Sequence, residues 1–419
     1  MVGQGVEYLA GAPGAVGPAS GCGIIGTMKT PAQPRRQPRR PSSAAGTTSA
    51  AIDLALQGGG SHGAFTWGAL ERLLEDETLS LDGISGSSAG ALNAAVLATG
   101  YADGGRAGAR DALRAFWLDV ASCGGGCFGG VPVPPTVALG AWPMPGLAGF
   151  NLDANPMYAW FNQFVRSFSP YQFNPYDLNL LRELTQRHVH EPAMQKGPLA
   201  LFVTATAVRT GQPRIFSGTE LTIDALMASA CLPQLFRSVM IDGEPYWDGG
   251  YSGNPALWPL IYNTKPLDIL LVKINPLVRP ELPDTALEIA DRVNEITFNA
   301  GLVSEMRAIA FVRRLVEQGR IDAGQFKALR LHMVADEEGL APLHPSSKLN
   351  TELAFIEALH DLGYAAAQRW LKAHRADVGK RASLDIEATF LAPREAPSNT
   401  RGQVSGKSKQ TARYKARET

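Results

Sequence analysis

The sequence is poor in cysteine and contains no long apolar run. Four cysteines in 419 residues are too few for a disulfide scaffold. Cys123 and Cys127 flank a glycine run, but two thiolates do not complete a tetrahedral zinc site, and no further ligand motif lies near them. We therefore expect neither a metal nor another cofactor. No uncharged apolar run approaches the ~20 residues of a membrane-spanning helix. The N-terminus also lacks the pattern of a secretory leader, so a cytoplasmic protein is expected.

An excess of either charge is also missing, because 39 Lys and Arg balance 39 Asp and Glu. The charge is nevertheless unevenly spread. Residues 1–50, rich in Gly, Ala, Pro and Ser, carry five basic residues against one Glu, and the polar residues 393–419 carry seven against two. We expect two disordered basic tails on an acidic body. They are either solvated linkers or attracted to anionic membranes, which keeps peripheral membrane contact open as an interpretation. They lack interleaved aromatic residues, so nucleic acid is not an expected partner.

Between the tails, residues 51–392 alternate strand and helix signals, which is typical of an α/β domain. With 45% hydrophobic residues in the chain, this body can bury a large core. Apolar segments predict strands at 51–57, 81–85, 198–208, 214–217, 268–274 and 329–334, and helices at 285–318 and 350–374. We expect a single domain with a helical C-terminal part at 285–375.

The stretch LALQGGGSHG contains G-x-G-x-x-G, formed by Gly58, Gly60 and Gly63, after a strand and before a helix. This is the fingerprint of dinucleotide binding, and Asp82 follows at about the distance of a ribose-binding acid. However, Asp82 precedes the apolar residues of its strand, whereas the ribose-binding acid should end the strand. The alternative is that the N–H groups of Gly58, Gly59 and Gly60 converge on an oxyanion.

A second motif, G-x-S-x-G, runs from Gly86 to Gly90 between a strand and a helix. Such a sharp turn exposes its central serine at the helix N-terminus, where the helix dipole favours developing negative charge. Only Ser88 has glycine two residues before and two residues after it, so Ser88 is the candidate nucleophile. The N–H group of Ala89 is a further candidate oxyanion donor.

A nucleophilic serine requires a base, and the stretch EPYWDGG supplies a carboxylate. Asp248 ends a short predicted strand, and Gly249 and Gly250 allow close approach to it. A D-G-G triplet on its own marks a turn more often than a site.

Together, the loop GGGSHG, the elbow GSSAG and the triplet DGG resemble, in this order, the motifs of the patatin-like phospholipases. The resemblance covers residues 52–260 and extends more loosely to about residue 374. It implies a three-layer α/β/α fold with a mainly parallel central sheet. It also implies release of fatty acid from lipid esters by a dyad of Ser88 and Asp248, without a metal or cofactor. The family often carries Arg or Lys at the position of His62, so the role of His62 is open: it is either an oxyanion partner or a cap of the loop.

A triad with a late histidine remains an alternative, since serine hydrolases also occur with the order Ser, Asp, His. His332 lies within a strand pattern and His360 within a helix pattern, both of which favour structural roles. His344, in a loop, is the best triad candidate.

An aromatic insertion occupies about residues 123–176. Met157, Trp160, Phe161 and Phe164 recur at helical spacing and predict one apolar stripe. This stripe either packs on the core or forms a lid or acyl-chain wall beside the site, which would suit a lipid or other long-chain ester. An acyltransferase or a polyester depolymerase would use the same residues. A non-catalytic lipid-binding protein of the same fold is the alternative from a different class.

Overall fold

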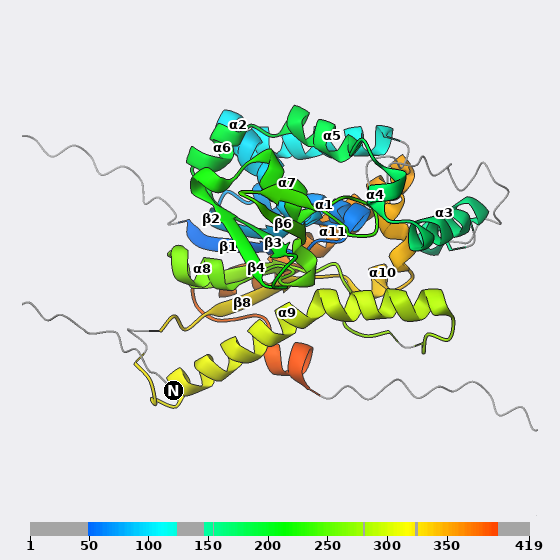
Figure 1. Cartoon of the computed structure of the whole chain (residues 1–419). Coiled ribbons are helices and arrows are strands. Elements are labelled where there is room, and N and C mark those ends of the chain that lie inside the picture. Colours follow the sequence, from blue (N-terminus) through cyan, green and yellow to red (C-terminus); the bar gives the residue numbers. More distant parts are fainter. Residues whose placement is uncertain (1–48, 124–145, 154, 280, 323–325, 393–419) are drawn as a thin grey trace, which may run out of the picture. The chain divides into compact units, whose positions relative to one another are not determined.

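A computed structural model describes residues 49–123, 146–153, 155–279, 281–322 and 326–392 (Figure 1). The strands are β1 (Ala50–Leu56), β2 (Leu79–Ser87), β3 (Ala200–Ala207), β4 (Pro213–Ser217), β5 (Val239–Ile241), β6 (Glu244–Asp248), β7 (Asp268–Val272) and β8 (Arg330–Val334). The α-helices are α1 (Gly63–Leu74), α2 (Ala89–Ser122), α3 (Pro156–Ser167), α4 (Pro170–Phe173), α5 (Leu180–His188), α6 (Glu191–Lys196), α7 (Ile223–Ser229), α8 (Trp258–Asn263), α9 (Ala286–Glu317), α10 (Glu337–Leu340) and α11 (Leu353–His374). The predicted C-terminal tail, residues 393–419, lies outside the described residues, as does the predicted N-terminal tail except for residues 49 and 50.

The described strands form a single mixed sheet with the order β5-β6-β3-β2-β1-β7-β8, and β4 also pairs with β3. β3, β2, β1, β7 and β8 are mutually parallel, whereas β4, β5 and β6 are antiparallel to their partners. β1 and β7 read as nearly continuous apolar runs because they lie in the middle of the sheet and are covered on both faces. The predicted mainly parallel sheet is confirmed, and β2 is longer than the predicted 81–85.

Helices cover both faces of this sheet (Figure 1). On one face, Leu54 and Leu56 of β1 belong to a buried cluster that includes Phe65 of α1 and further residues of α2 and α11. On the other face, Ala55 of β1 belongs to a second cluster that includes Leu302 of α9. Alternate residues of one strand therefore serve two separate cores, as expected for a strand between two helical layers. The predicted three-layer α/β/α fold is confirmed.

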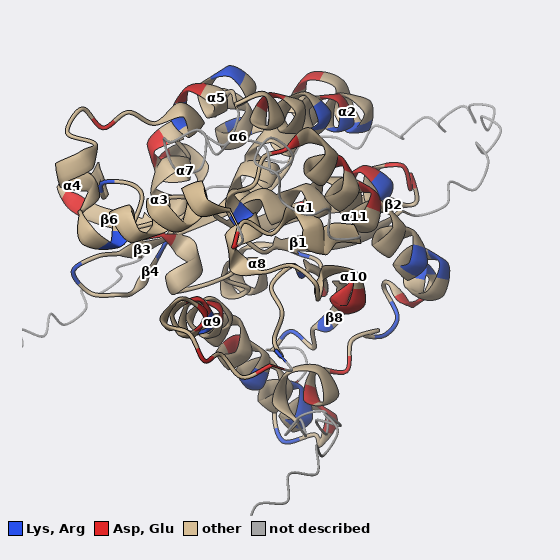
Figure 2. Cartoon of the chain, turned by 90° about the vertical axis from the view of Figure 1, so that its right-hand side faces the viewer, with Lys and Arg blue, Asp and Glu red and all other residues tan. Residues whose placement is uncertain are grey.

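Charged residues are spread over the outer helices with both signs interspersed, for example on α2, α5 and α9 (Figure 2). Within the described part of the chain, no helix combines the length and the apolarity that crossing a membrane requires.

The register of β3 brings two distant segments together. β4 occupies one edge of β3 from Phe202 to Thr206. On the opposite edge, β2 pairs up to Ser87, which lies beside Thr204. The last residue of β6, Asp248, follows beside Ala205, because β6 runs antiparallel to β3. β2 and β6 thus meet end to end along one edge of β3. The residues that follow Ser87 and the carboxylate of Asp248 must therefore lie close together.

Candidate active site

Ser88 occupies a strained turn between β2 and α2. Its backbone φ is 53° and ψ is −125°, a left-handed conformation that is rare for a residue with a side chain. The Ser88 N–H group donates to Oγ of Ser229 at 2.9 Å. A Cβ atom on Gly90 would overlap the carbonyl oxygen of Leu56, so α2 can start this close to β1 only with glycine at this position. Gly86, the penultimate residue of β2, packs directly against Gly90.

Asp248 is completely buried at the end of β6. Its Oδ1 atom accepts a hydrogen bond from the N–H group of Gly250 at 2.7 Å, within the short 3-10 turn of Gly249 to Tyr251. Oδ2 is buried and has no hydrogen-bond partner among the described residues. Burial raises the pKa of Asp248 to about 7, against the smaller opposing effects of the Gly250 N–H group, the nearby Ser88 hydroxyl and the charge of Lys348. A carboxylate with this pKa can accept a proton near neutral pH.

The glycine loop follows β1 and lies against the nucleophile. A Cβ atom on Gly58 would approach Cβ of Ser88 to 2.6 Å. The N–H group of Gly58 donates to Oδ1 of Asn254 at 2.6 Å, and its carbonyl oxygen accepts from Nδ2 of Asn275 at 2.7 Å. The N–H group of Gly58 is therefore engaged in this conformation and does not face an empty oxyanion position. Gly59 and Gly60 remain the candidate donors from this loop.

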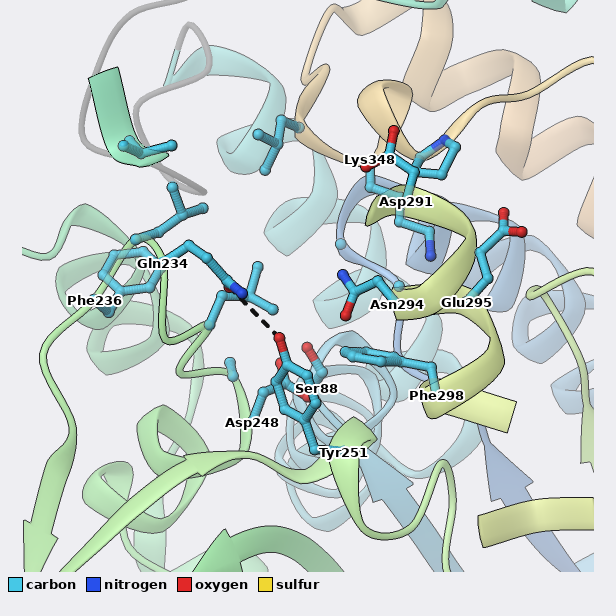
Figure 3. Close-up of a pocket in the computed structure, with 18 of the residues that line it drawn as sticks. Ser88, Gln234, Phe236, Asp248, Tyr251, Asp291, Asn294, Glu295, Phe298 and Lys348 are labelled. Atoms are coloured by element: carbon cyan, nitrogen blue, oxygen red, sulfur yellow. Dashed lines mark hydrogen bonds between the residues drawn. The ribbon is translucent and has the colours of Figure 1, made fainter. Parts of the chain in front are cut away.

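Ser88 and Asp248 open into one cavity of about 490 Å³ (Figure 3). Its lining residues include three groups. Gly59, Gly60 and Ala89 lie at the reaction site; Leu92, Phe161, Val165, Leu181, Leu232, Leu235 and Phe236 are apolar; and Arg166, Asp291, Asn294, Glu295 and Lys348 are polar or charged. One part of the wall therefore suits an acyl chain and another part suits a polar group.

The aromatic stripe is divided between the cavity and the surface. Phe161 is 3% exposed and lines the cavity, whereas Trp160 is 59% exposed and stacks on Phe164 with 5.4 Å between ring centroids. Met157 is also largely exposed. The predicted stripe is therefore split: Trp160 and Phe164 stack on each other, whereas Phe161 alone of the four residues lines the cavity.

The candidate triad histidines lie away from the cavity that holds Ser88 and Asp248. Among the described residues, no histidine lines the cavity. Nδ1 of His344 lies 2.9 Å from Oδ2 of Asp153, and His332 lies between Asp268 and Ser383. His360 contacts Glu71 and Asp361 through its two ring nitrogens. This placement does not support a triad.

His62 is buried, and its Nε2 atom lies 2.8 Å from Oγ of Ser347. Burial, together with the charges of Lys348 and Arg279, holds its pKa well below the usual range, so the ring is neutral. Gly63 is the first residue of α1, directly after His62. His62 is the N-cap residue of α1 by position, but its side chain makes no capping hydrogen bond. Its contact with Ser347 favours a structural role over a contact with an oxyanion.

Asp82, the candidate ribose-binding acid, lies far from the glycine loop. Asp82 lies next to Leu81, which pairs with Ile52, whereas the glycine loop begins beyond Leu56 at the opposite end of β1. The acid and the glycines are thus too far apart for the dinucleotide interpretation. The described residues also contain no group of three or more His, Cys, Asp or Glu that could hold a metal ion.

Several site residues were not identified from the sequence. Asn275 follows β7, so its place beside the glycine loop could have been predicted, because the carboxyl ends of neighbouring parallel strands share one edge of the sheet. Asn254 and Lys348 lie in loops without a recognisable motif, and only the folded chain brings them to the site.

The solved structures to which the chain is similar include the following three. VipD from Legionella pneumophila shares 13% identity over 81% of this chain and 72% of that chain, with a TM-score of 0.31. The ExoU–SpcU complex of the Pseudomonas aeruginosa type III secretion system shares 16% over 78% of this chain and 52% of that chain, with a TM-score of 0.27. The type III effector protein ExoU shares 17% over 76% of this chain and 53% of that chain, with a TM-score of 0.24. The chain thus spans about half the length of the two ExoU chains.

No curated protein matches the chain. Residues 54–261, however, match the family model described as patatin-like phospholipase. The matched segment contains the glycine loop, the elbow of Ser88 and the strand that ends at Asp248. Through this segment, the chain carries a patatin-like phospholipase domain.

Proposed function

We propose that the chain is a serine acyl hydrolase that cleaves fatty-acyl esters of phospholipids or related lipids with Ser88 as nucleophile and Asp248 as base. The main support is the shared edge of β3, which directs the serine turn and a buried carboxylate with an unpaired oxygen into one cavity. The catalytic domain proposed is residues 51–392.

The reaction begins when Asp248 accepts the proton of the Ser88 hydroxyl group and Oγ attacks the ester carbonyl carbon. The N–H groups of Gly59, Gly60 and Ala89 stabilise the resulting oxyanion. Collapse of the tetrahedral intermediate breaks the bond to the alcohol oxygen, which takes the proton from Asp248. Water then attacks the acyl-serine with the help of the same carboxylate and releases the fatty acid.

The cavity supports a substrate with a long acyl chain, because apolar side chains from α2, α3 and α5 line it. A non-catalytic lipid-binding role gains no support, because a binding protein has no need for a strained serine or an unpaired buried carboxylate. Peripheral contact with a membrane follows from such a substrate and belongs to the same proposal.

The test is hydrolysis of p-nitrophenyl esters of increasing chain length. Ser88→Ala and Asp248→Asn should each lower kcat/KM by at least ~10³-fold, since both remove a group that reacts. His344→Ala is the matched control and should keep activity, because His344 lies outside the cavity. Activity that survives in Ser88→Ala would refute the proposal. Activity lost in His344→Ala, with the variant folded, would favour a triad instead.

A further inference from the structure

The segment Pro345–Leu349, a short 3-10 helix, braces the glycine loop although it lies almost 300 residues further along the chain. The carbonyl oxygen of Lys348 packs so closely on Gly60 that a Cβ atom on that glycine would overlap it. Ser347 lies within hydrogen-bond distance of His62. The position of the loop therefore depends on this segment.

The side chain of Lys348 extends from this segment into the wall of the cavity that holds Ser88 and Asp248 (Figure 3). Its Nζ atom donates to Oδ1 of Asn275 at 2.8 Å, and Asn275 in turn donates to the carbonyl oxygen of Gly58. Lys348 is thus linked to the glycine loop both through its main chain and through its amine.

The ammonium group of Lys348 has hydrogen-bond donors beyond the one that Asn275 accepts. An ammonium group has three donors, and Asn275 takes one of them. Nζ also lies 5.8 Å from the centroid of the Phe298 ring. No described carboxylate lies within ion-pair distance of Nζ, although Glu295 nearby is held by Arg279 and Arg292. A partly buried cation without a carboxylate partner, facing a cavity, is arranged to interact with negative charge that the cavity receives.

Negative charge arises in this cavity during the proposed reaction. As Asp248 takes the proton of Ser88, the charge moves from the carboxylate to the substrate oxygen beside Gly59 and Gly60. Burial lowers the pKa of the Lys348 amine, whereas the nearby charges of Glu295, Asp291 and Asp248 raise it. The charge of Lys348 in turn lowers the pKa of Asp248. Its contact with Gly60 places it on the side of the loop to which the charge moves.

We propose, resting on the function proposed above, that Lys348 is a further charged residue of the reaction site, which orders the glycine loop through Asn275 and stabilises the oxyanion with its ammonium group. The same position could not be filled by His62, whose neutral ring lies against Ser347. The ammonium group near the oxyanion would then come from Pro345–Leu349, the same segment that holds the glycine loop in place.

The test compares Lys348→Met, which keeps the length of the side chain without its charge, with Lys348→Arg, which keeps a charge. Lys348→Met should lower kcat/KM by about 10- to 100-fold, somewhat less than the loss of a direct oxyanion donor. Lys348→Arg should recover part of this loss. Lys327→Met is the matched control, because Lys327 is also partly buried but donates to the carbonyl oxygens of Leu260 and Thr264, outside the cavity. It should leave kcat/KM within about 2-fold of the wild type.

The pH profile separates electrostatic from structural effects. Without the ammonium group, the pKa of Asp248 should rise further, so the acid limb of kcat/KM in Lys348→Met should move to higher pH. Cys231 and Tyr251, which also face Asp248, stay neutral in this range, because burial raises the pKa of each to about 12. Burial raises the pKa of Asp291 to about 6, so Asp291 also titrates in this range. The pH dependence of kcat/KM is therefore measured in Asp291→Asn as well, where this carboxyl group is absent. Glu295 and Arg279 remain ion-paired throughout.

Equal activities of Lys348→Met and Lys327→Met would overturn the proposal, as would a loss that leaves the acid limb unmoved and is not recovered by Lys348→Arg. Should Lys348→Met not fold, Lys348→Gln, which keeps a polar group facing Asn275, takes its place in the same comparison. The wild type and Ser88→Ala are measured first. An inert wild type, or an active Ser88→Ala, would overturn the proposed function and the role of Lys348 together, whereas the outcomes above overturn the role of Lys348 alone.

Discussion

Replacing Asp248 by Asn should stabilise the protein at neutral and alkaline pH while it removes the proposed base. The pKa of this buried carboxyl is about 7, against 3.8 for a solvated aspartate. Between these two values the folded protein binds more protons than the unfolded chain. Its stability therefore falls as the pH rises through this window and stays low above it. An asparagine carries no charge, so the variant escapes this loss.

The size of the effect follows from about 1.4 kcal/mol per pKa unit. From pH 4.5 to pH 8, the free energy of unfolding of Asp248→Asn should gain roughly 3 kcal/mol relative to the wild type. For a domain of this size, that corresponds to about 4–5 °C in Tm. Any packing cost of the amide is independent of pH and cancels when the two pH values are compared. Thermal unfolding followed by circular dichroism at both pH values measures the difference.

Asp268→Asn is the control with the opposite sign. The Asp268 carboxylate lies 2.6 Å from Nη2 of Arg330, and its hydrogen bonds to His332 and Arg330 hold its pKa well below the usual range against the effect of burial. Its contribution to stability is present above the unfolded pKa and is lost as the pH falls through the folded pKa, so this variant should be less stable at pH 8. If the advantage of Asp248→Asn stayed constant or shrank as the pH rose, the proposed burial cost of the ionised carboxylate would be refuted.

Three further outcomes are expected. Gly90→Ala should abolish esterase activity or soluble expression, because the added methyl group overlaps the main chain of β1; an active, stable variant would contradict the geometry of the elbow. Phe161→Ala should lower kcat/KM for long-chain esters more than for short-chain esters, whereas Trp160→Ala, at the exposed side of α3, should leave the ratio unchanged. Equal losses on both substrates in Phe161→Ala would indicate general destabilisation. Native alkylation by iodoacetamide, mapped by mass spectrometry, should modify Cys231 at least ~10-fold more slowly than Cys123, because Cys231 is buried and burial raises the pKa of its thiol to about 12.

Much of the fold could be predicted from local patterns. The apolar runs of β1 and β7 and the elbow at Ser88 each depend on residues that are close in sequence, so periodicity and turn chemistry identify them. The short antiparallel strands at the edge of the sheet carry weaker signals, because three to five residues show little periodicity.

The site was predictable only where a motif marks it. Ser88 and Asp248 stand in recognisable glycine-rich contexts, but the partners that hold the loop come from loops without a pattern. The hydrogen bond from the Gly58 N–H group to Asn254 joins residues almost 200 positions apart. The position of Lys348 likewise depends on the contact of its carbonyl oxygen with the distant Gly60. Helical spacing likewise groups Trp160 with Phe161, although it cannot tell which side of α3 faces the cavity.

The end-to-end arrangement of β2 and β6 along β3 links activity to the completion of folding. Ser88 can be positioned by β2 early, but Asp248 arrives only when β6 has docked beside Ala205 in the correct register. A slip of one residue would turn Asp248 to the other face of the sheet and leave Ser88 without its proposed base. A partly folded chain would thus lack the proposed activity, which depends on the same hydrogen bonds that close this edge of the sheet.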